Sequence, residues 1–416
     1  MDVAPPLAEV IAEQRLRIVA GLIRVTGDWD LAEDCLQDAV ERALTRWPRD
    51  GIPDNPAAWL TTTAHRRALD VLRRRRTEVD KLQAMTAMAQ LEPPADTPFD
   101  QSDDVYRDDR LRLLFTCCHP ALPLTGRVAL TLKTVAGLST REVARAFLVS
   151  EATMGQRLLR TRAKIANAGI SFRVPAPHRL AERTAGVLAV VYLVFNEGYA
   201  GTEGEATRDD LAAEAVRLTG LVARLLPADD EVHGLRALLL LQHARRVTRT
   251  DSAGDLVPME EQDRSRWDSA MLSAGLASLT LARATGRPPR SYRLQAEIAA
   301  EHATAPHAAA TDWARVVTGY DALLRVQPSP VVALNRAVAL GFRDGPDAGL
   351  HALAGVEEDK RLAGYHLRPA ARADLLRRAG RGAEAIAAYQ EALGLVHTAA
   401  ERRFVQRRMR EIDGGS

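Results

Sequence analysis

Four basic side chains recur along one short stretch of the chain, at Arg157, Arg160, Arg162 and Lys164. Guanidinium and ammonium groups donate hydrogen bonds to phosphate oxygens and to the acceptor atoms at base edges, and they accept none. Cations that recur every two or three residues on a helix therefore indicate that the helix binds a polyanion.

Acidic and basic residues are unevenly distributed along the chain. Its 416 residues have a formal net charge of +2, so the chain as a whole is not a polycation. Within residues 110–173, however, the only acidic residues are Glu142 and Glu151. Residues 78–109 have the opposite bias, with nine acidic residues and two basic ones. A basic module that follows an acidic segment suggests a polyanionic partner for the module.

Two helix starts must position these cations. Ser139 followed by Glu142 has the spacing of a capping box, in which each side chain binds a free backbone N–H of the other residue. Ser150 is a second N-cap candidate, which follows the three-residue turn 147–149. The pattern predicts a short helix, a tight turn and a longer second helix.

The second of these helices has an apolar and a polar face. Met154, Leu158 and Ile165 form its apolar stripe. A helix-turn-helix places such a second helix in the major groove, where its first residues reach base edges and its later arginines reach phosphates. The alternative is a solvated basic helix in an αα-hairpin. The candidate DNA contacts are Glu151, Ala152, Gln156, Arg157, Arg160, Arg162 and Lys164.

A second pair of expected helices lies nearer the N-terminus. The sequence WLTTTAHRRALDVLRRRR (59–76) predicts a helix with an apolar face and a strongly basic face. DWDLAEDCLQDAVERAL (28–44), just before it, predicts an acidic amphipathic helix. A basic face and an acidic face in one small unit suggest two partners, namely DNA and a basic protein surface.

The whole chain is expected to be all-α. Alanine, leucine and arginine dominate, β-branched alternation is scarce, and apolar residues recur at helical spacing. Pro175-Ala176-Pro177 is expected to break the chain before a larger helical region. Near its end, Ala385, Tyr389 and Ala392 have the small–aromatic–small spacing of tetratricopeptide repeats.

Two groups of residues have types that could form a metal or catalytic site. Adjacent cysteines such as Cys117-Cys118 before His119 are poor chelators, and no second Cys/His pair follows at finger spacing, so no metal site is expected. Asn196-Glu197-Gly198-Tyr199 reads as a helix C-terminus rather than a catalytic cluster with His233 and His243. No phosphate-binding loop occurs. We therefore expect no enzyme activity and no cofactor.

The location of the protein is expected to be cytoplasmic. Three cysteines form no disulfide framework, which fits a reducing compartment. The first eighteen residues lack the apolar core of a signal peptide, and no run approaches the length of a membrane span. No membrane partner is expected.

Three blocks in fixed order resemble a known family. They are AED-x-x-QD (32–38), WL-x-x-x-A-x-x-R-ALD-x-x-RR (59–74) and LS-x-x-EVA…VS-x-x-T-x-x-x-R-L-x-R-x-R (138–162). Together they resemble an extracytoplasmic-function sigma factor of the sigma-70 family. The first two blocks resemble its region 2 and the last resembles its region 4. The part from about residue 180 onward resembles the helical, tetratricopeptide-like tail of one subgroup.

The resemblance implies a division of the chain. By this resemblance the chain comprises region 2 (1–77), a flexible acidic linker (78–108), a region 4 helix-turn-helix (109–174) and a helical regulatory domain (180–416). Core RNA polymerase, through its clamp and flap, and promoter DNA are the implied partners. Asp34, Gln37 and Asp38 would bind the polymerase, and the helix from Ser150 would read the −35 element. The residues implied in −10 binding are Trp59, His65, Arg66, Arg67, Asp70, Arg73 and Arg74.

The expected function is therefore promoter-specific initiation of transcription, with the tail as regulator. The tail is expected to bind a protein partner or to dock on the chain's own sigma domains. Two alternatives stay open. One is a helix-turn-helix regulator with a sensory helical domain and no sigma role, and the other is an enzyme tethered to a DNA reader. A plain regulator has no need for the acidic block at 32–38 or for the block at 59–74.

Overall fold

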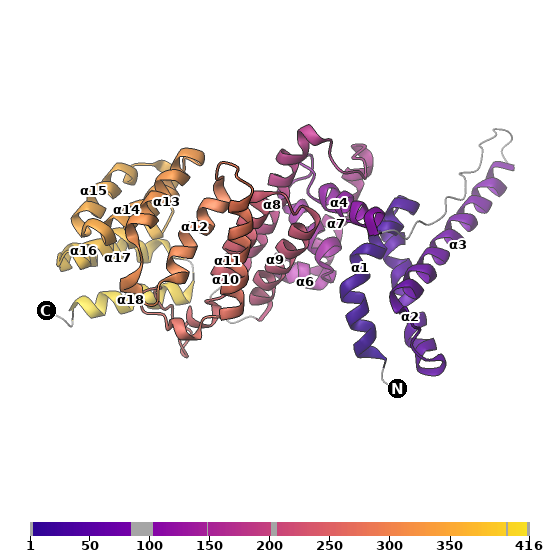
Figure 1. Cartoon of the computed structure of the whole chain (residues 1–416), viewed down its shortest axis with the longest axis horizontal. Helices are drawn as coiled ribbons and strands as arrows, with labels where there is room; N and C mark the ends of the chain where they lie inside the picture. Colours follow the sequence, from indigo (N-terminus) through magenta and orange to yellow (C-terminus); the bar gives the residue numbers. More distant parts are fainter. Residues whose placement is uncertain (1–2, 85–102, 148, 201–205, 397, 414–416) are drawn as a thin grey trace. The chain divides into compact units, whose positions relative to one another are not determined.

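The computed structural model describes residues 3–84, 103–147, 149–200, 206–396 and 398–413 (Figure 1). Within these residues the chain is helical, and the only β pairing is an isolated bridge between Thr250 and Leu256. The all-α prediction is thus confirmed. The chain forms two compact units, Met1–Val190 and Val191–Ser416.

The first unit begins with three long helices that pack against one another: α1 (Ala4–Thr26), α2 (Trp29–Asp50) and α3 (Pro56–Ala84). Gly27 ends α1 in the left-handed region, at φ 66°, a conformation that glycine adopts without steric cost. Asp28 then caps α2 by accepting hydrogen bonds from the N–H groups of Asp30 and Leu31, both at 3.1 Å. The expected acidic helix is therefore present and extends six residues beyond its expected end at 44.

The rest of the first unit is built of shorter helices. They are α4 (Asp103–Cys117), α5 (Leu124–Leu130), the π-helix η1 (Thr131–Ala136), α6 (Thr140–Ala146) and α7 (Glu151–Asn167). Helices α6 and α7 pack together as the expected helix-turn-helix. Leu148, in the turn between them, lies outside the described residues.

The expected linker is helical at both ends. Helix α3 continues seven residues past the expected boundary at 77, and α4 begins at Asp103, before the expected boundary at 108. Residues 85–102, in the middle of this segment, lie outside the described residues. The expected linker contains Pro93, Pro94 and Pro98, and proline is unfavourable inside a helix. The residues before and after these prolines are compatible with a helix, which explains why α3 and α4 extend into the expected linker.

The break at Pro175-Ala176-Pro177 is the start of a helix rather than the border of a unit. Helix α8 (Pro177–Ala200) begins there, and the two compact units divide inside it, between Val190 and Val191. The first part of α8 belongs to the first unit, where Arg183 donates a hydrogen bond of 2.5 Å to the carbonyl oxygen of Phe115. Proline at the first helical position is compatible with a helix, since its missing N–H needs no partner there.

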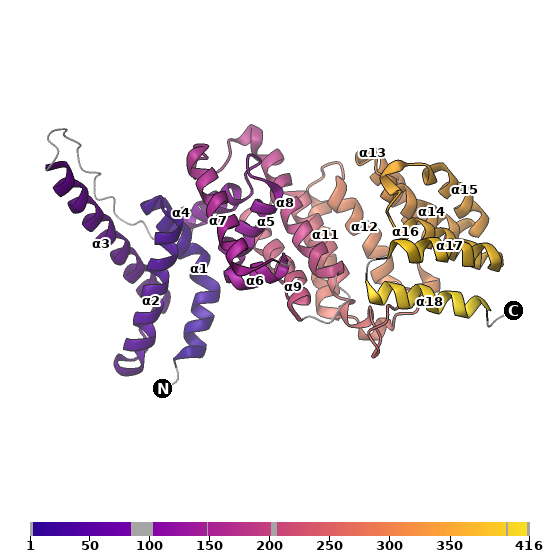
Figure 2. The same ribbon diagram turned by 180° about the vertical axis from the view of Figure 1, so that it is seen from behind.

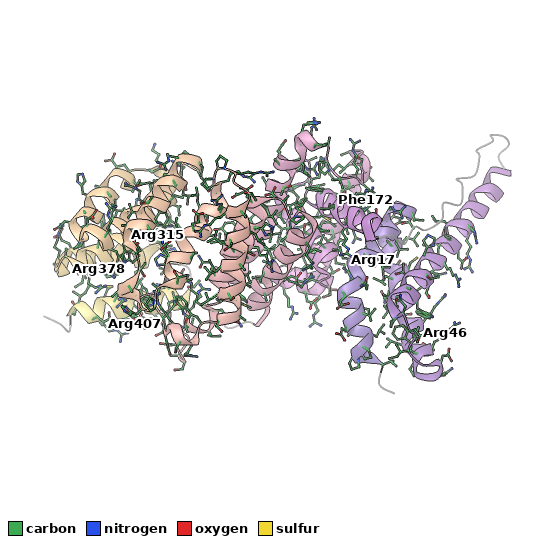
Figure 3. All side chains as sticks on the ribbon, in the orientation of Figure 1. Arg17, Arg46, Phe172, Arg315, Arg378 and Arg407 are labelled. Atoms are coloured by element: carbon green, nitrogen blue, oxygen red, sulfur yellow. The ribbon has the colours of Figure 1, made fainter. Side chains whose placement is uncertain are left out.

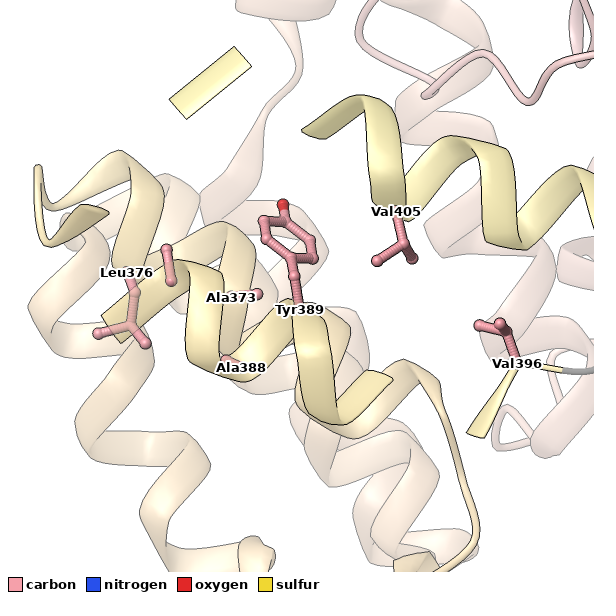
Figure 4. Packing of buried hydrophobic residues seen from close by; sticks show 7 residues of the cluster. Ala373, Leu376, Ala388, Tyr389, Val396 and Val405 are labelled. Carbon is pink, nitrogen blue, oxygen red and sulfur yellow. The ribbon is translucent and has the colours of Figure 1, made fainter. Parts of the chain in front are cut away.

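The C-terminal unit is a succession of helices in which neighbours along the chain also pack in space (Figure 2). Such nearest-neighbour packing is typical of helical repeats. Tyr389 is 2% exposed, and with Ala385 and Ala388 it forms a core cluster that Val405 of the last helix completes (Figure 4). The helices are α9 (Ala206–Leu225), α10 (Asp230–His243), α11 (Ser269–Ala284), α12 (Ser291–Thr304), α13 (Trp313–Val326), α14 (Pro330–Asp344), α15 (Pro346–Glu357), α16 (Leu367–Arg378), α17 (Gly382–Leu395) and α18 (Ala399–Asp413), with the 3-10 helices η2 (Arg246–Thr248), η3 (Arg264–Arg266), η4 (Ala308–Ala310) and η5 (Lys360–Leu362) between them.

Helices α10 and α12 approach unusually closely. The Glu231 carboxylate of α10 accepts hydrogen bonds of 3.0 Å from the backbone N–H groups of Tyr292 and Arg293, at the start of α12. Burial nevertheless raises the pKa of Glu231. One turn later, Gly234 faces the same backbone, and a Cβ placed on it would lie 2.6 Å from the Arg293 nitrogen. Only glycine fits this crossing without a shift of one helix.

We predict that Gly234→Ala lowers the free energy of unfolding by about 1–3 kcal/mol, since the added methyl group must push two packed helices apart. Urea unfolding followed by circular dichroism measures the change. Gly355→Ala is the matched control, because a Cβ there meets no atom within 4 Å. It should raise the free energy by about 0.5–1 kcal/mol, the ordinary effect in a helix. Equal effects of the two substitutions would contradict the close approach.

Candidate nucleic-acid and protein interface

The helix-turn-helix is fixed by the two predicted caps. The backbone N–H of Ser139 donates to Glu142 Oε2 at 2.7 Å, and the Glu142 N–H donates to Ser139 Oγ at 3.2 Å. These bonds lower the pKa of the Glu142 carboxyl. Ser150 Oγ accepts from the Thr153 N–H at 3.2 Å and starts α7. Both predicted helix starts are confirmed.

Helix α7 presents a polar outer face, as expected. Met154, Leu158 and Ile165 are buried against the rest of the first unit. The Arg157 guanidinium lies 5.3 Å from the centre of the Phe147 ring of the preceding turn, which holds it close to the helix start. The exposed side chains of the candidate set are Glu151, Ala152, Gln156, Arg160 and Lys164.

Arg162 points to a different side from the other candidates. Its side chain is 12% exposed, and its guanidinium forms ion pairs with Asp30 and, at 3.5 Å, with Glu33 of α2. The expectation that it lies on the DNA-facing side is not met in this arrangement. Its position four residues after Leu158 puts it on the buried face of the helix, a signal that the charge pattern concealed.

Glu33 gathers cations from three elements. Besides Arg162 of α7, it has Arg15 of α1 at 3.6 Å and Lys133 of η1 at 3.7 Å. Arg15 also donates a hydrogen bond of 3.0 Å to the carbonyl oxygen of Thr134. Sequence reasoning missed this cluster, because its members are separated by up to 147 residues and each looks like an ordinary surface charge.

A second charged contact ties the same two parts of the unit. Asp109 of α4 is fully buried, and its carboxylate binds Arg24 of α1 at 2.9 Å and Arg112 at 2.8 Å. Both oxygens have a guanidinium partner, as a buried carboxylate requires. Compensated charges therefore help to hold α1 and α2 to α4, η1 and α7, beside the packing of α1 against α4.

The candidate polymerase-binding residues lie on the outer side of α2. Asp34 and Gln37 are exposed, whereas Asp38 is half-buried and accepts a 2.5 Å hydrogen bond from Nε of Arg67 on α3. These side chains line a shallow hollow of about 430 Å³ between the two helices. The arrangement presents acceptor groups to a basic partner.

The candidate −10 residues lie along α3. Trp59 packs edge-on against Trp47, with the ring centres 5.5 Å apart. Trp47 itself is 2% exposed inside α2, because the helix packing buries its large apolar ring. Burial and Arg24 lower the pKa of the half-buried His65. The exposed members of the set are Arg66, Asp70, Arg73 and Arg74.

The three cysteines and the two histidines of α10 are packed within the fold. Cys35, Cys117 and Cys118 are free and buried, and burial raises the pKa of Cys35 and Cys118 to about 11. His233 Nε2 lies 2.9 Å from the carbonyl oxygen of Pro227, and His243 packs edge-on against Phe195. Among the described residues, no group of three His, Cys, Asp or Glu side chains could hold a metal ion. None of the described helices is long and apolar enough to cross a membrane.

Comparisons with known proteins place these elements in families. The family described as Sigma-70 region 2 matches residues 11–78, and that described as Sigma-70, region 4 matches residues 112–165. A family of unknown function, DUF6596, matches residues 183–283.

Two relatives differ in how much of the chain they share. An uncharacterized protein of Rhizobium meliloti (strain 1021) is 45% identical over 399 residues, which cover 95% of this chain and 93% of that protein. A probable ECF RNA polymerase sigma factor, SigI, of Mycobacterium tuberculosis is 29% identical over 203 residues, which cover 47% of this chain and 69% of that protein. No solved structure matches the chain.

We predict that Glu33 and Arg162 stabilise the first unit as a pair. In a double-mutant cycle of Glu33→Gln and Arg162→Gln, their coupling should be about 1–2 kcal/mol, between the values of exposed and buried ion pairs. Urea unfolding supplies the four free energies. The exposed Glu41, on the same helix, gives the matched cycle with Arg162, and its coupling should be near zero. A coupling near zero for Glu33 as well would show that this contact contributes nothing.

Proposed function

The chain belongs to the extracytoplasmic-function sigma factors of the sigma-70 family, as a member with a long helical C-terminal extension, and we propose that this extension regulates its activity. We further propose that α2 and α7 contact polymerase and promoter as set out below. The observation that carries this assignment is the presence, in one unit, of a helix-turn-helix with a basic outer face and an acidic helix whose outer face exposes Asp34 and Gln37. In a regulator that only binds DNA, the acidic outer face of α2 would have no function.

We propose that the outer face of α2 binds the polymerase clamp, with Asp34, Gln37 and Asp38 as acceptors. The neighbouring Arg67 already compensates Asp38, so Asp34 is the more available charge for a basic partner. Region 4 would bind the flap on a side of the helix-turn-helix away from DNA. This pairing of an acidic surface with a basic one would orient the two proteins as well as attract them.

We propose that α7 reads the −35 element and α3 holds the −10 strand. Arg157 and Arg160 would contact bases or phosphates in the major groove. Trp59 would offer a ring for stacking against an extruded base, and the exposed arginines of α3 would bind the strand's phosphates. No covalent step is needed, because binding the melted strand is enough to favour opening.

The contact between α2 and α7 would have to open for both elements to be bound. Promoter elements some 20 base pairs apart are separated by about 70 Å of helix, whereas Glu33 and Arg162 lie 3.5 Å apart here. Opening would release Arg162, which could then reach a phosphate. Its two environments would belong to two states of the protein, the free form and the promoter complex.

We predict that Asp34→Arg together with Asp38→Arg abolishes co-purification with core RNA polymerase and promoter-specific run-off transcription, because like charges would then face each other. The control is Glu9→Arg with Glu13→Arg, two exposed acids at the same four-residue spacing on α1. The control should keep wild-type activity, and circular dichroism should show unchanged helicity in both. Full polymerase binding by the α2 variant would exclude this face.

We predict that removing residues 191–416, the second compact unit, changes promoter-specific run-off transcription at least severalfold while residues 1–190 still bind core polymerase. The C-terminal unit has cores of its own, so residues 191–416 alone should be soluble, helical and cooperative in thermal unfolding. Transcription unaffected by the truncation would exclude a regulatory role, and an unfolded fragment would exclude an autonomous domain.

A further inference from the structure

The C-terminal unit has a cavity that none of the functions above uses. It has a volume of about 750 Å³ and lies between residues 258–264 and the helices α12, η4, α13, α14 and α16. This volume is within the range of pockets that bury a small organic molecule. All of its lining residues belong to the same compact unit.

One wall of the cavity is a braced aromatic stack. Trp313 of α13 and Phe342 of α14 lie parallel, with ring centres 4.1 Å apart and an angle of 8° between their planes. The Arg378 guanidinium lies 4.0 Å from the centre of the Phe342 ring, and His302 meets Trp313 edge-on at 5.3 Å. Arg378 is labelled in Figure 3. Because the rings hold one another in place, this apolar wall exists before any ligand binds.

The lining carries one cation without a carboxylate partner. Arg378 is compensated by Glu260 at 2.5 Å and by Asp374 at 2.6 Å. Arg264, by contrast, lies within ion-pair distance of no carboxylate in the described part of the chain. Its Nη1 donates to the carbonyl oxygens of His302 and Ala305, both at 2.6 Å, so its position is fixed while the rest of its planar fork is left for another acceptor.

The remaining polar groups of the lining are neutral donors and acceptors. Burial, with Arg245 and Arg264 nearby, lowers the pKa of His302 to about 4, so its ring is uncharged at neutral pH. Burial raises the pKa of Tyr320 to about 12, so its hydroxyl keeps its proton. Both residues, with Asn335, also line an adjoining cavity of about 460 Å³ that has no acidic side chain in its walls. A cationic ligand would find no free anion in either cavity.

We propose that this cavity binds a small organic anion, with its anionic group on Arg264 and its apolar body against the Trp313–Phe342 stack. A carboxylate, sulfonate or phosphate accepts two parallel hydrogen bonds from such a fork. The hydroxyl of Tyr320 and the amide of Asn335 are placed to bind further polar atoms of the ligand. The inference concerns binding alone, and it stands whether or not the C-terminal unit regulates transcription.

Fluorescence titration of the full-length chain with anilinonaphthalenesulfonate tests the proposal. This probe joins an aromatic body to one anionic group, and its uncharged parent, phenylnaphthylamine, lacks the anion. The sulfonate should bind saturably with one site per chain and more tightly than the parent. Arg264→Gln should weaken sulfonate binding about tenfold or more, the effect of losing a charge-assisted hydrogen bond, and should leave the parent's binding nearly unchanged.

Two matched controls make the test specific. Arg266→Gln removes an exposed charge two residues away that does not line the cavity, and it should leave sulfonate binding unchanged. Ala309→Trp should fill the cavity and abolish binding of both probes, whereas Ala310→Trp, next to it but outside the lining, should not. If Arg264→Gln unfolds the unit, the comparison of Ala309→Trp with Ala310→Trp still shows whether the probes bind in this cavity. Equal binding of both probes, equal effects of the two arginine variants, or full binding by Ala309→Trp would overturn the proposal.

Discussion

The half-buried carboxylate of Glu33, with cations of three separate elements around it, is the interaction on which the arrangement of the first unit depends. Two parts of the unit meet here, and these charges add to the packing of α1 against α4, where side chains such as Val19 and Leu113 are fully buried. Asp109 adds a second such point, with a guanidinium at each of its oxygens. Water would solvate these charges if they separated, which would offset part of the cost of breaking the ion pairs.

The C-terminal unit follows a different physical rule. Its helices pack with their sequence neighbours through small residues, and close approaches such as that of Gly234 to the start of α12 leave no room for adjustment. The Glu231 carboxylate fixes the same crossing by binding two backbone N–H groups. Close packing of this kind keeps a cavity open without a ligand. The cavity lined by the stacked rings of Trp313 and Phe342 is one example.

Local features of this protein could be predicted from the sequence, and long-range ones could not. The capping box of Ser139 and Glu142, the N-cap at Ser150 and the apolar stripe of α7 depend on residues within a few positions of one another, and the structure confirms all three. The burial of Arg162 could have been inferred from its distance to Leu158, but its charge suggested the opposite. The cation cluster of Glu33 and the cavity behind Arg264 join residues more than a hundred positions apart, and no spacing rule reports such contacts. The division inside α8 was missed for a related reason, since a proline pair resembles a domain border and can equally start a helix.

The burial of Cys35, Cys117 and Cys118 has a practical consequence for chemical labelling. Alkylating reagents attack the thiolate, and a thiol whose pKa is near 11 is almost entirely protonated at neutral pH. All three sulfur atoms are also shielded from a reagent in the folded chain. A single cysteine introduced on an exposed helix face would therefore react selectively with a maleimide dye, and the native cysteines could stay in place. Slow modification of the native thiols would in turn report on unfolding of the first unit.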